Sequence, residues 1–551
     1  MQWTQNYDPL GNPLLSTACA ALPLVVLLGA IGIFQMRIHL AALLGLGVAL
    51  AVALLAFGMP VRPALAAVGY GAAYGLMPIG WIILNLIYLY QLTVKKGSFA
   101  VLREHLGSFV PDKRIQLILI AFSLGAFFEG AAGFGTPVAI TAAILIQLGF
   151  KPLEASVLSL IANTAPVAFG ALGTPILALS GVTGIDLHAL SAMIGRQLPL
   201  FSLIVPFWVV WAYSGFRGVL GIWPAALTAG LAFSTAQFAV SNFHGPWLVD
   251  VVGAIASMAA LILLLRFWQP RRLDEPAGEG RSDSESPTAA TRREVVAAWA
   301  PWILLTAVIF VWGLPQVKRG LNAVSEPHFE VPYLHEVVLR GYPVAPQPSP
   351  SAPTRPEDAV YKLGWLSATG SGILVAALLA GVLMSFSVRE MAKTYLETLV
   401  RVRYSLVTIA AMLALGYVTK YSGTDATLGL ALAKTGVLYP FFGTLLGWLG
   451  VALTGSDTAS NVLFGSLQKI TAEQTGGSAT LMAAANSSGG VMGKMVDAQS
   501  IVVASTATNF YGHEGQILRR VLVHSLVLAS LVGLVVMLQA YVYPFTLMVV
   551  R

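Results

Sequence analysis

The sequence predicts an all-α protein that crosses a membrane many times. Its 551 residues are 56% hydrophobic and only 10% charged, whereas about a quarter of the residues in a soluble domain carry charge. Mean hydropathy is +0.76. Apolar runs of roughly 20 residues, long enough to span the hydrocarbon core as helices, recur along the whole chain. These observations exclude a soluble globular protein.

The charge pattern limits the partners of the chain. The formal net charge of +7 is expected to lie in loops that face an anionic membrane surface, and the lack of long basic tracts predicts no nucleic-acid partner. Cys19 is the only cysteine, which excludes an intramolecular disulfide. Residues 1–13 lack a basic segment, so the first helix is expected to be retained rather than cleaved as a secretory signal.

Three spanning helices are predicted in residues 1–90. They cover residues 14–36, 38–58 and 63–90. The charged segment 95–114 that follows surrounds an amphipathic core with basic residues. It is predicted to lie as an interfacial helix on the cytoplasmic side of the membrane.

A glycine-rich segment, FFEGAAGFGTP at 127–137, separates two short apolar runs at 114–128 and 136–149. Each run is about 22 Å long as a helix, which is too short to span a bilayer comfortably. We therefore predict a re-entrant hairpin with Glu129 in the break at its tip. A buried ionisable residue inside a membrane is a functional-site hypothesis by default.

Residues 153–180 predict a helix that is broken in its middle, because Pro166 and Pro175 interrupt the apolar run. The loop at 314–360 is proline-rich and is expected to be extracytoplasmic, without a core of its own. The remaining spans are predicted at 189–214, 217–237, 248–268, 295–313 and 361–386, with a polar linker at 269–294.

Comparison of the sequence with itself indicates two homologous halves. Four short matches occur in the same order, shifted by 291 to 298 positions. The first pairs residues 97–113 with 388–404, which predicts a second interfacial helix. The other three pair Glu129 with Lys420, Asn163 with Asp457, and Arg196 with Lys494. The resulting units are 1–90, a first repeat core at 91–214, helices at 215–268, the linker, helices with the loop at 295–386, a second repeat core at 387–510, and a C-terminal helix at 511–551.

Two hairpin tips and two helix breaks that meet near the membrane centre would surround a polar cavity with helix N-termini, which favours an anion. Carboxylates there are candidate proton carriers, since a buried carboxylate can load and release a proton in the physiological range. The candidate proton carriers are Glu129, Asp457 and Asp497. The candidate substrate-binding residues are Lys420, Lys494, Arg196, Asn163, Thr164, Ser456, Thr458, Asn461 and Asn486.

Structural roles compete with these assignments. Glu129 could satisfy backbone amides of the hairpin or pair permanently with Lys420, and Asp457 could be a helix N-cap. Lys494 and Asp497 could pair along one helix face. The cation at position 196 could extend to the membrane interface.

An enzyme is the rival class of protein. The sequence has no His-Glu-x-x-His motif, no Gly-x-Ser-x-Gly elbow and no Walker loop. We therefore expect no catalytic site, no metal and no other cofactor.

Taken together, these motifs resemble the bacterial L-lactate permease family. The resemblance lies in FEGAAGFGTPVAI, ANTAPVAFGALGTP and LTGSDTASNVLFGSLQ, and it covers nearly the whole chain. It implies a carrier of the elevator type that imports L-lactate, D-lactate or glycolate by proton symport through a bacterial inner membrane. The partners would then be a small monocarboxylate, the coupling proton and the lipid bilayer.

Several alternatives stay open at this point. A sodium-coupled or exchange carrier for another small organic anion would fit the same polar residues. The residues do not decide between inverted and parallel repeats, or between a monomer and a homodimer.

Overall fold

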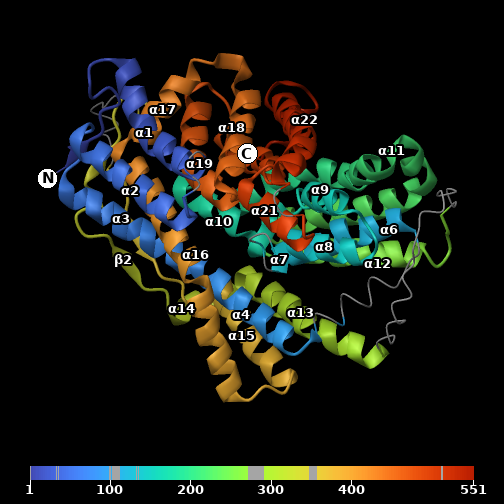
Figure 1. Cartoon of the computed structure of the whole chain (residues 1–551). Helices are drawn as coiled ribbons and strands as arrows, with labels where there is room; N and C mark the ends of the chain where they lie inside the picture. Colours follow the sequence, from blue (N-terminus) through green and yellow to red (C-terminus); the bar gives the residue numbers. More distant parts are fainter. Residues whose placement is uncertain are drawn as a thin grey trace.

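The fold is built from helices of very different lengths, in which long spans surround several short and broken ones (Figure 1). The computed structural model describes residues 2–32, 34, 36–98, 101, 112–131, 133, 136–270, 291–345, 356–510 and 513–550. In these ranges, six helices are long and apolar enough to cross a membrane, or up to eight if each sharply bent pair forms one span. Most of their buried side chains join one large apolar core.

The N-terminal region has helices at all three predicted spans, but only the third, Val61–Lys95, is long and apolar enough to cross a membrane by itself, and the first two are shorter apolar helices. Its elements are β1 (Trp3–Thr4), α1 (Pro13–Gly32), α2 (Ile38–Leu55), α3 (Val61–Tyr74), η1 (Gly75–Gly80) and α4 (Trp81–Lys95). The third span bends at Met77, whose backbone leaves the helical region just before Pro78. Most of the predicted interfacial helix at 95–114 lies outside the described residues.

The hairpin differs from the prediction in where its turn begins. The elements α6 (Lys113–Leu117), η2 (Ile118–Leu124) and α7 (Gly125–Ala131) form one 19-residue helix, and α8 (Thr136–Gln147) packs back against it. The placement of Glu129 in the glycine-rich break was wrong, because this residue lies inside α7. Glycine alone does not end a helix whose other residues are apolar and buried, so the helix continues to Ala131.

Two helix breaks bring backbone ends into the interior. The first separates α9 (Pro152–Ala162) from α10 (Gly170–Thr183), with η3 (Val167–Phe169) between them and a bend of 63°. The second is the turn at Gly455, where φ is +72°, between α18 (Tyr439–Thr454) and α19 (Asp457–Gln474). These two helices pack antiparallel, since Tyr439 Oη donates to Gln468 Oε1 at 2.6 Å and Ser460 Oγ donates to the Gly447 carbonyl at 3.1 Å, so they form a helical hairpin and not the second broken helix that was predicted. The first break confirms the interruption that the prolines predicted.

The long element α11 (Leu187–Phe243) is two antiparallel limbs joined at Gly215, where φ is +68°. Ser202 Oγ donates to Gln237 Oε1 at 2.7 Å, and Ser191 Oγ donates to the Ser241 carbonyl at 2.9 Å. The limbs match the spans predicted at 189–214 and 217–237. α12 (Val249–Leu264) packs against α11 and α7.

The loop between α13 (Arg292–Gly313) and α15 (Thr369–Leu383) has regular structure. It contains α14 (Pro315–Val324), β2 (His328–Glu330), β3 (Val338–Leu339) and β4 (Val360–Lys362). β3 pairs in parallel with β1 and β2 pairs antiparallel with β4, while Leu334 and Val338 are buried in the main core. The prolines stop long helices but leave apolar side chains free to pack.

The second predicted interfacial helix, at 388–404, is only the first half of α16 (Val388–Ser422). This helix begins with a capping box at Ser387 and Glu390 and ends at Gly423, where φ is +83°. An apolar run without proline follows the charged segment, so the helix continues. The remaining elements are α17 (Thr424–Ala433), η4 (Gly436–Leu438), α20 (Ala479–Gly493), α21 (Ala498–Ala507), α22 (Glu514–Tyr541) and η5 (Phe545–Met548).

Helices from the N-terminal and C-terminal parts of the chain touch each other. α4 packs against α15 and α10 packs against α19. Asn85 Nδ2 donates to the Gly370 carbonyl at 3.0 Å, and Asn461 Nδ2 donates to the Pro175 carbonyl at 3.2 Å. The members of these pairs lie 285 and 286 positions apart, close to the shift of the sequence matches. The duplication itself stays a prediction.

Candidate functional site

The two helix breaks meet at a cavity of about 390 Å³. Its wall combines Val167, Gly170 and Thr174 of the first break with Gly455 and neighbouring residues of the second. One side of α16 and the tip of the first hairpin complete the wall. The polar and charged lining residues are Arg37, His39, Glu129, Thr174, Tyr404, Ser405, Thr408, Thr454, Ser456, Asp457, Thr458, Lys494 and Gln499.

Asp457 lies in the first turn of α19 and faces this cavity. Its Oδ2 accepts hydrogen bonds from Ser487 Oγ and from Asn461 Nδ2 at 3.3 Å, while its buried Oδ1 has no hydrogen-bond partner. The N-cap of α19 is Ser456, whose Oγ accepts from the Ala459 N–H at 3.2 Å. Asp457 therefore is not the cap, and it keeps one oxygen for another group.

Lys494 lies at the end of α20 and places a buried cation beside the second break. Its Nζ donates to the Gly455 carbonyl at 2.6 Å and is 3.5 Å from Asp497 Oδ2. Asp497 caps α21, since its Oδ1 accepts from the Ser500 N–H at 2.8 Å. The structural pairing of Lys494 and Asp497 is thus present, but only Lys494 of this pair lines the cavity.

Glu129 approaches from the first hairpin and is 4% exposed. Its Oε2 accepts from Asn163 Nδ2 at 3.1 Å. A Cβ atom at Gly170 would lie only 2.6 Å from Glu129 Oε1, so the glycine makes room for the carboxylate. The cavity therefore has carboxylates from two different helices, together with the Lys494 cation.

The predicted amide and hydroxyl residues fall into two groups. Ser456 and Thr458 line the cavity. Asn461 and Asn486 lie behind it in one hydrogen-bond chain, in which Asn486 Nδ2 donates to Asn461 Oδ1 at 3.0 Å. Thr164 is buried and donates to the Ile161 carbonyl at 2.8 Å, within the first break. The second group supports the cavity wall.

Arg196 and Lys420 do not line the cavity. Arg196 Nε donates to Asn242 Oδ1 at 3.0 Å, and its Nη1 donates to the Met548 carbonyl at 3.0 Å. Lys420 lies seven residues beyond Leu413, the last residue of α16 that lines the cavity. This distance is about 10 Å along the helix. The expected meeting of Glu129 and Lys420 across two hairpin tips is absent among the described contacts.

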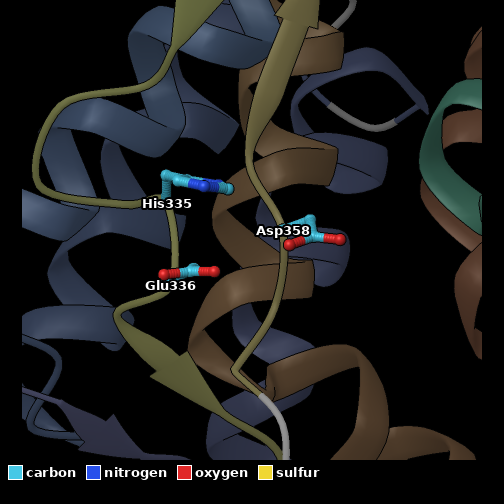
Figure 2. Close-up of side chains that lie close together, drawn as sticks. All are labelled: His335, Glu336 and Asp358. Carbon is cyan, nitrogen blue, oxygen red and sulfur yellow. The ribbon is translucent and has the colours of Figure 1, made fainter.

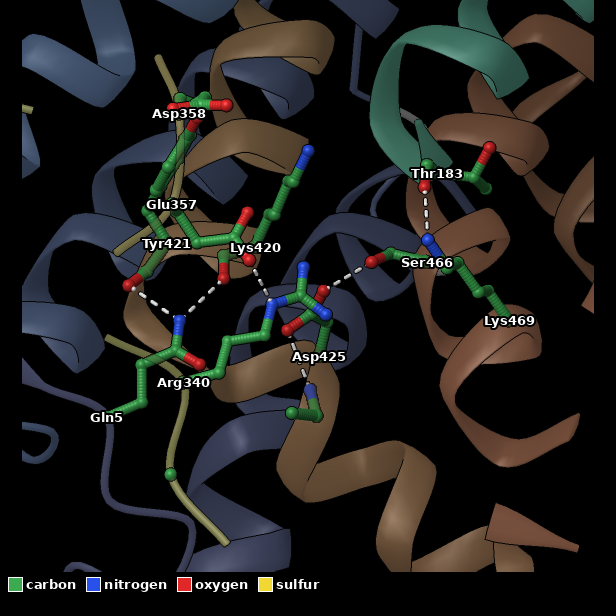
Figure 3. Close-up of polar contacts among 12 residues, drawn as sticks. Gln5, Thr183, Arg340, Glu357, Asp358, Lys420, Tyr421, Asp425, Ser466 and Lys469 are labelled. Carbon is green, nitrogen blue, oxygen red and sulfur yellow. Dashed lines mark hydrogen bonds and ion pairs between the residues drawn. The ribbon is translucent and has the colours of Figure 1, made fainter. Parts of the chain in front are cut away.

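Lys420 instead belongs to a second polar cluster, formed by the N-terminal segment, the loop and the end of α16 (Figure 3). Gln5 Nε2 donates to the carbonyls of Lys420 and Tyr421 at 2.9 and 3.0 Å. In the loop, Arg340 Nε lies 2.6 Å from Glu357 Oε1. Because Gln5 satisfies carbonyls that the helix end leaves free, we interpret this cluster as a clamp on the end of α16.

A third group lies in the loop, and among the residues that the structure describes it is the only group of His, Asp and Glu side chains close enough together to hold a metal ion. Ligand atoms of His335, Glu336 and Asp358 lie within 4.8 Å of one another (Figure 2). His335 Nδ1 accepts from the Ala359 N–H at 3.2 Å, and both acids are exposed. Exposed acidic groups are common without an ion. We therefore assign no cofactor to it.

Sequence reasoning missed Asp250, which is 1% exposed. A Cβ atom at Gly130 would lie 2.8 Å from Asp250 Cβ, so this acid packs beside the Glu129 turn. The signal was present, since Asp250 is the one charged residue in the apolar segment 247–264. Asp250 was not considered as a site residue because the segment was interpreted as an ordinary membrane span.

A multi-helical membrane fold with broken helices around a buried, charged cavity defines a membrane transporter. The sequence profile of the family described as "L-lactate permease" matches residues 16–543. The chain therefore belongs to the L-lactate permease family.

Relatives match over almost their entire length. The glycolate permease GlcA of Escherichia coli K12 is 44% identical, covering 98% of each chain. The L-lactate permease of Bacillus subtilis 168 is 45% identical, covering 99% of this chain and 100% of the relative. The L-lactate permease of Escherichia coli K12 is 44% identical over 98% of each chain. Among solved structures, the Neisseria gonorrhoeae efflux pump MtrF gives a TM-score of 0.45 at 13% identity, covering 87% of this chain and 83% of that one.

Proposed function

We propose that this protein imports L-lactate and related 2-hydroxymonocarboxylates, including D-lactate and glycolate, by proton symport through a bacterial inner membrane. The single observation that carries the proposal is one cavity lined by Lys494, Glu129 and Asp457 in a member of the L-lactate permease family. The cavity offers a cation for the substrate and carboxylates for the proton.

The substrate carboxylate would bind near Lys494 and the start of α19. The Lys494 ammonium donates to one backbone carbonyl and has further hydrogens available. Ser456, Asp457 and Thr458 form the N-terminal end of α19, where free N–H groups and the helix dipole favour an anion. The hydroxyl groups of Ser456 and Thr458 would bind the 2-hydroxyl group of the substrate.

Charge balance explains the coupled proton. An anion that enters a low-dielectric cavity alone adds one negative charge beside Glu129 and Asp457, which is costly. A proton taken up on one of these carboxylates leaves the net charge of the cavity unchanged. Asp457 Oδ1, buried and without a hydrogen-bond partner, is well suited to take it.

We also propose alternating access of the elevator type, in which the broken helix α9–α10 and the helical hairpin α18–α19 carry the site across the membrane. Both breaks contribute to one cavity, so they would have to move together. This proposal would be tested by cross-linking a cavity helix to α3, which packs against α16.

Uptake by the purified protein in liposomes tests the proposed function. We expect labelled L-lactate to accumulate when the outside is more acidic, without sodium on either side, and unlabelled glycolate to compete with it. Accumulation that follows a sodium gradient at fixed pH would support the sodium-coupled alternative. Exchange without net accumulation under either gradient would contradict symport.

A further inference from the structure

Asp250 is a buried acid whose carboxylate has no described partner. It lies in the first turn of α12 and is 1% exposed. Neither Oδ1 nor Oδ2 has a hydrogen-bond partner. Burying an ionised carboxylate without a hydrogen-bond donor is strongly unfavourable, so a residue of this kind needs an explanation beyond packing.

Asp250 adjoins Glu129 because α12 packs directly against α7. At Gly130, an added Cβ atom would lie 2.8 Å from Asp250 Cβ and 3.1 Å from Val251 Cγ2. Only glycine permits this approach of the two helices. The Asp250 side chain therefore lies beside the helix turn that carries Glu129.

The two acids differ in their access to the substrate. Glu129 lines the cavity, whereas Asp250 does not. Asp250 therefore lies behind Glu129 as seen from the substrate. Burial of two carboxylates on neighbouring helix turns disfavours ionisation of both, so a proton held by either of them would be stabilised.

The other described charged groups around α12 are more distant along the chain. His244 ends α11, and its Nε2 lies 3.2 Å from the Phe310 carbonyl of α13. Lys318 of α14 lies over the Trp247 ring, 3.5 Å from its centroid.

We propose that Asp250 is a second proton-carrying residue that exchanges a proton with Glu129 during transport. This inference rests on the proposed proton symport. In the transfer, the O–H bond of Glu129 breaks and an O–H bond forms on Asp250. The negative charge moves from Asp250 to Glu129, and no other reactant is consumed. The substrate could then leave Lys494 while the proton is held one helix away.

The Asp250→Asn variant separates this role from a structural one. Asparagine keeps the shape of the side chain but cannot carry the proton. We expect lactate counterflow, which needs binding and movement without net proton transfer, to stay within about twofold of wild type. Accumulation driven by a pH gradient should fall at least about tenfold, as a change of about 1.4 kcal/mol produces. Asp425→Asn is the matched control and should keep both activities, because Asp425 is a buried acid of α17 that accepts a hydrogen bond from Ser466 Oγ and does not line the cavity.

Each other outcome decides the question. An Asp250→Asn variant that accumulates lactate normally would overturn the inference. Loss of counterflow as well as accumulation, in Asp250→Asn and in a second variant Asp250→Ser, would also overturn it in favour of a structural role. If wild type itself ignores the pH gradient, the proposed function fails, and this result is distinguishable because it does not involve the variant.

Discussion

Lys494 is the buried cation that the cavity offers to a substrate carboxylate. We expect Lys494→Gln to raise the KM for lactate at least about tenfold, because a lost charge-assisted contact is worth roughly 1.4 kcal/mol or more. Lys469→Gln is the matched control, since Lys469 Nζ also donates to a backbone carbonyl, that of Thr183 at 2.9 Å, but does not line the cavity. Equal KM values for the two variants in liposome uptake would contradict the assignment of Lys494.

Gly170 leaves room for the Glu129 carboxylate. The φ of Gly170 is −58° and its ψ is 157°, a backbone conformation that alanine can adopt. An alanine Cβ would displace Glu129 Oε1 and weaken the hydrogen bond from Asn163. We expect Gly170→Ala to fold but to reduce gradient-driven uptake by about tenfold, the effect of losing roughly 1.4 kcal/mol. Gly69→Ala, where the added methyl meets nothing within 4 Å, should be neutral.

The sequence identified part of the site residue by residue. Charged side chains in glycine-rich segments of the sequence stand out in an apolar chain, which is why Glu129, Asp457 and Lys494 could be named. Lys420 was named because the repeat pairs it with Glu129. An alignment of the two halves relates positions in the sequence but not their surroundings, and only Lys420 of this pair lies in the clamp. Asp250 was missed because nothing in a regular helical pattern marks which face meets Glu129.

At the level of elements, breaks were easier to predict than helix ends. Pro166 and Pro175 interrupt a helix for local steric reasons, so the first break was visible in the sequence. The continuation of α7 through Glu129 depends on burial by α8 and α12, which local sequence does not encode. The same holds for the strands, since β1 finds its partner in a distant loop.

The short helix α14 places Lys318 against the Trp247 ring outside the candidate spans. Burial lowers the pKa of Lys318 from 10.5 to about 8. Because the pKa is lowered, the neutral and nucleophilic amine becomes populated above about pH 8, well before that of an ordinary lysine. We expect acylation of Lys318, followed by mass spectrometry between pH 7 and 10, to have its midpoint near pH 8.

The exposed Lys393 is the reference for this measurement. Replacing Trp247 by alanine should move the Lys318 profile towards higher pH, because the ammonium regains water. A Lys318 profile that coincides with that of Lys393 would refute the lowered pKa.

At the scale of the whole molecule, the clamp helps to assign which parts of the chain lie on each side of the membrane. It joins the N-terminal segment, the loop and the end of α16, so these three must lie on one side. The other end of α16 carries basic residues at 389, 393, 401 and 403. By the positive-inside rule we expect that end to be cytoplasmic and the clamp to face outward.

Single cysteines test this topology after Cys19 is replaced by serine. We expect a cysteine at Asn6 to react with a membrane-impermeant maleimide in intact cells, and a cysteine at Lys393 to react only after the membrane is opened. Both positions are exposed, so access to the reagent is limited by the membrane alone. Labelling of both positions in intact cells would contradict the assignment.

The clamp also fixes an order of events during synthesis. Gln5 leaves the ribosome among the first residues, yet its hydrogen-bond acceptor at Lys420 lies 415 positions later. The contact cannot close until α16 has been made and inserted, since contacts so distant in the chain form only after the intervening segments. Until then the N-terminal segment can pair only with β3 of the loop, and its docking onto α16 completes the clamp after that helix has been made.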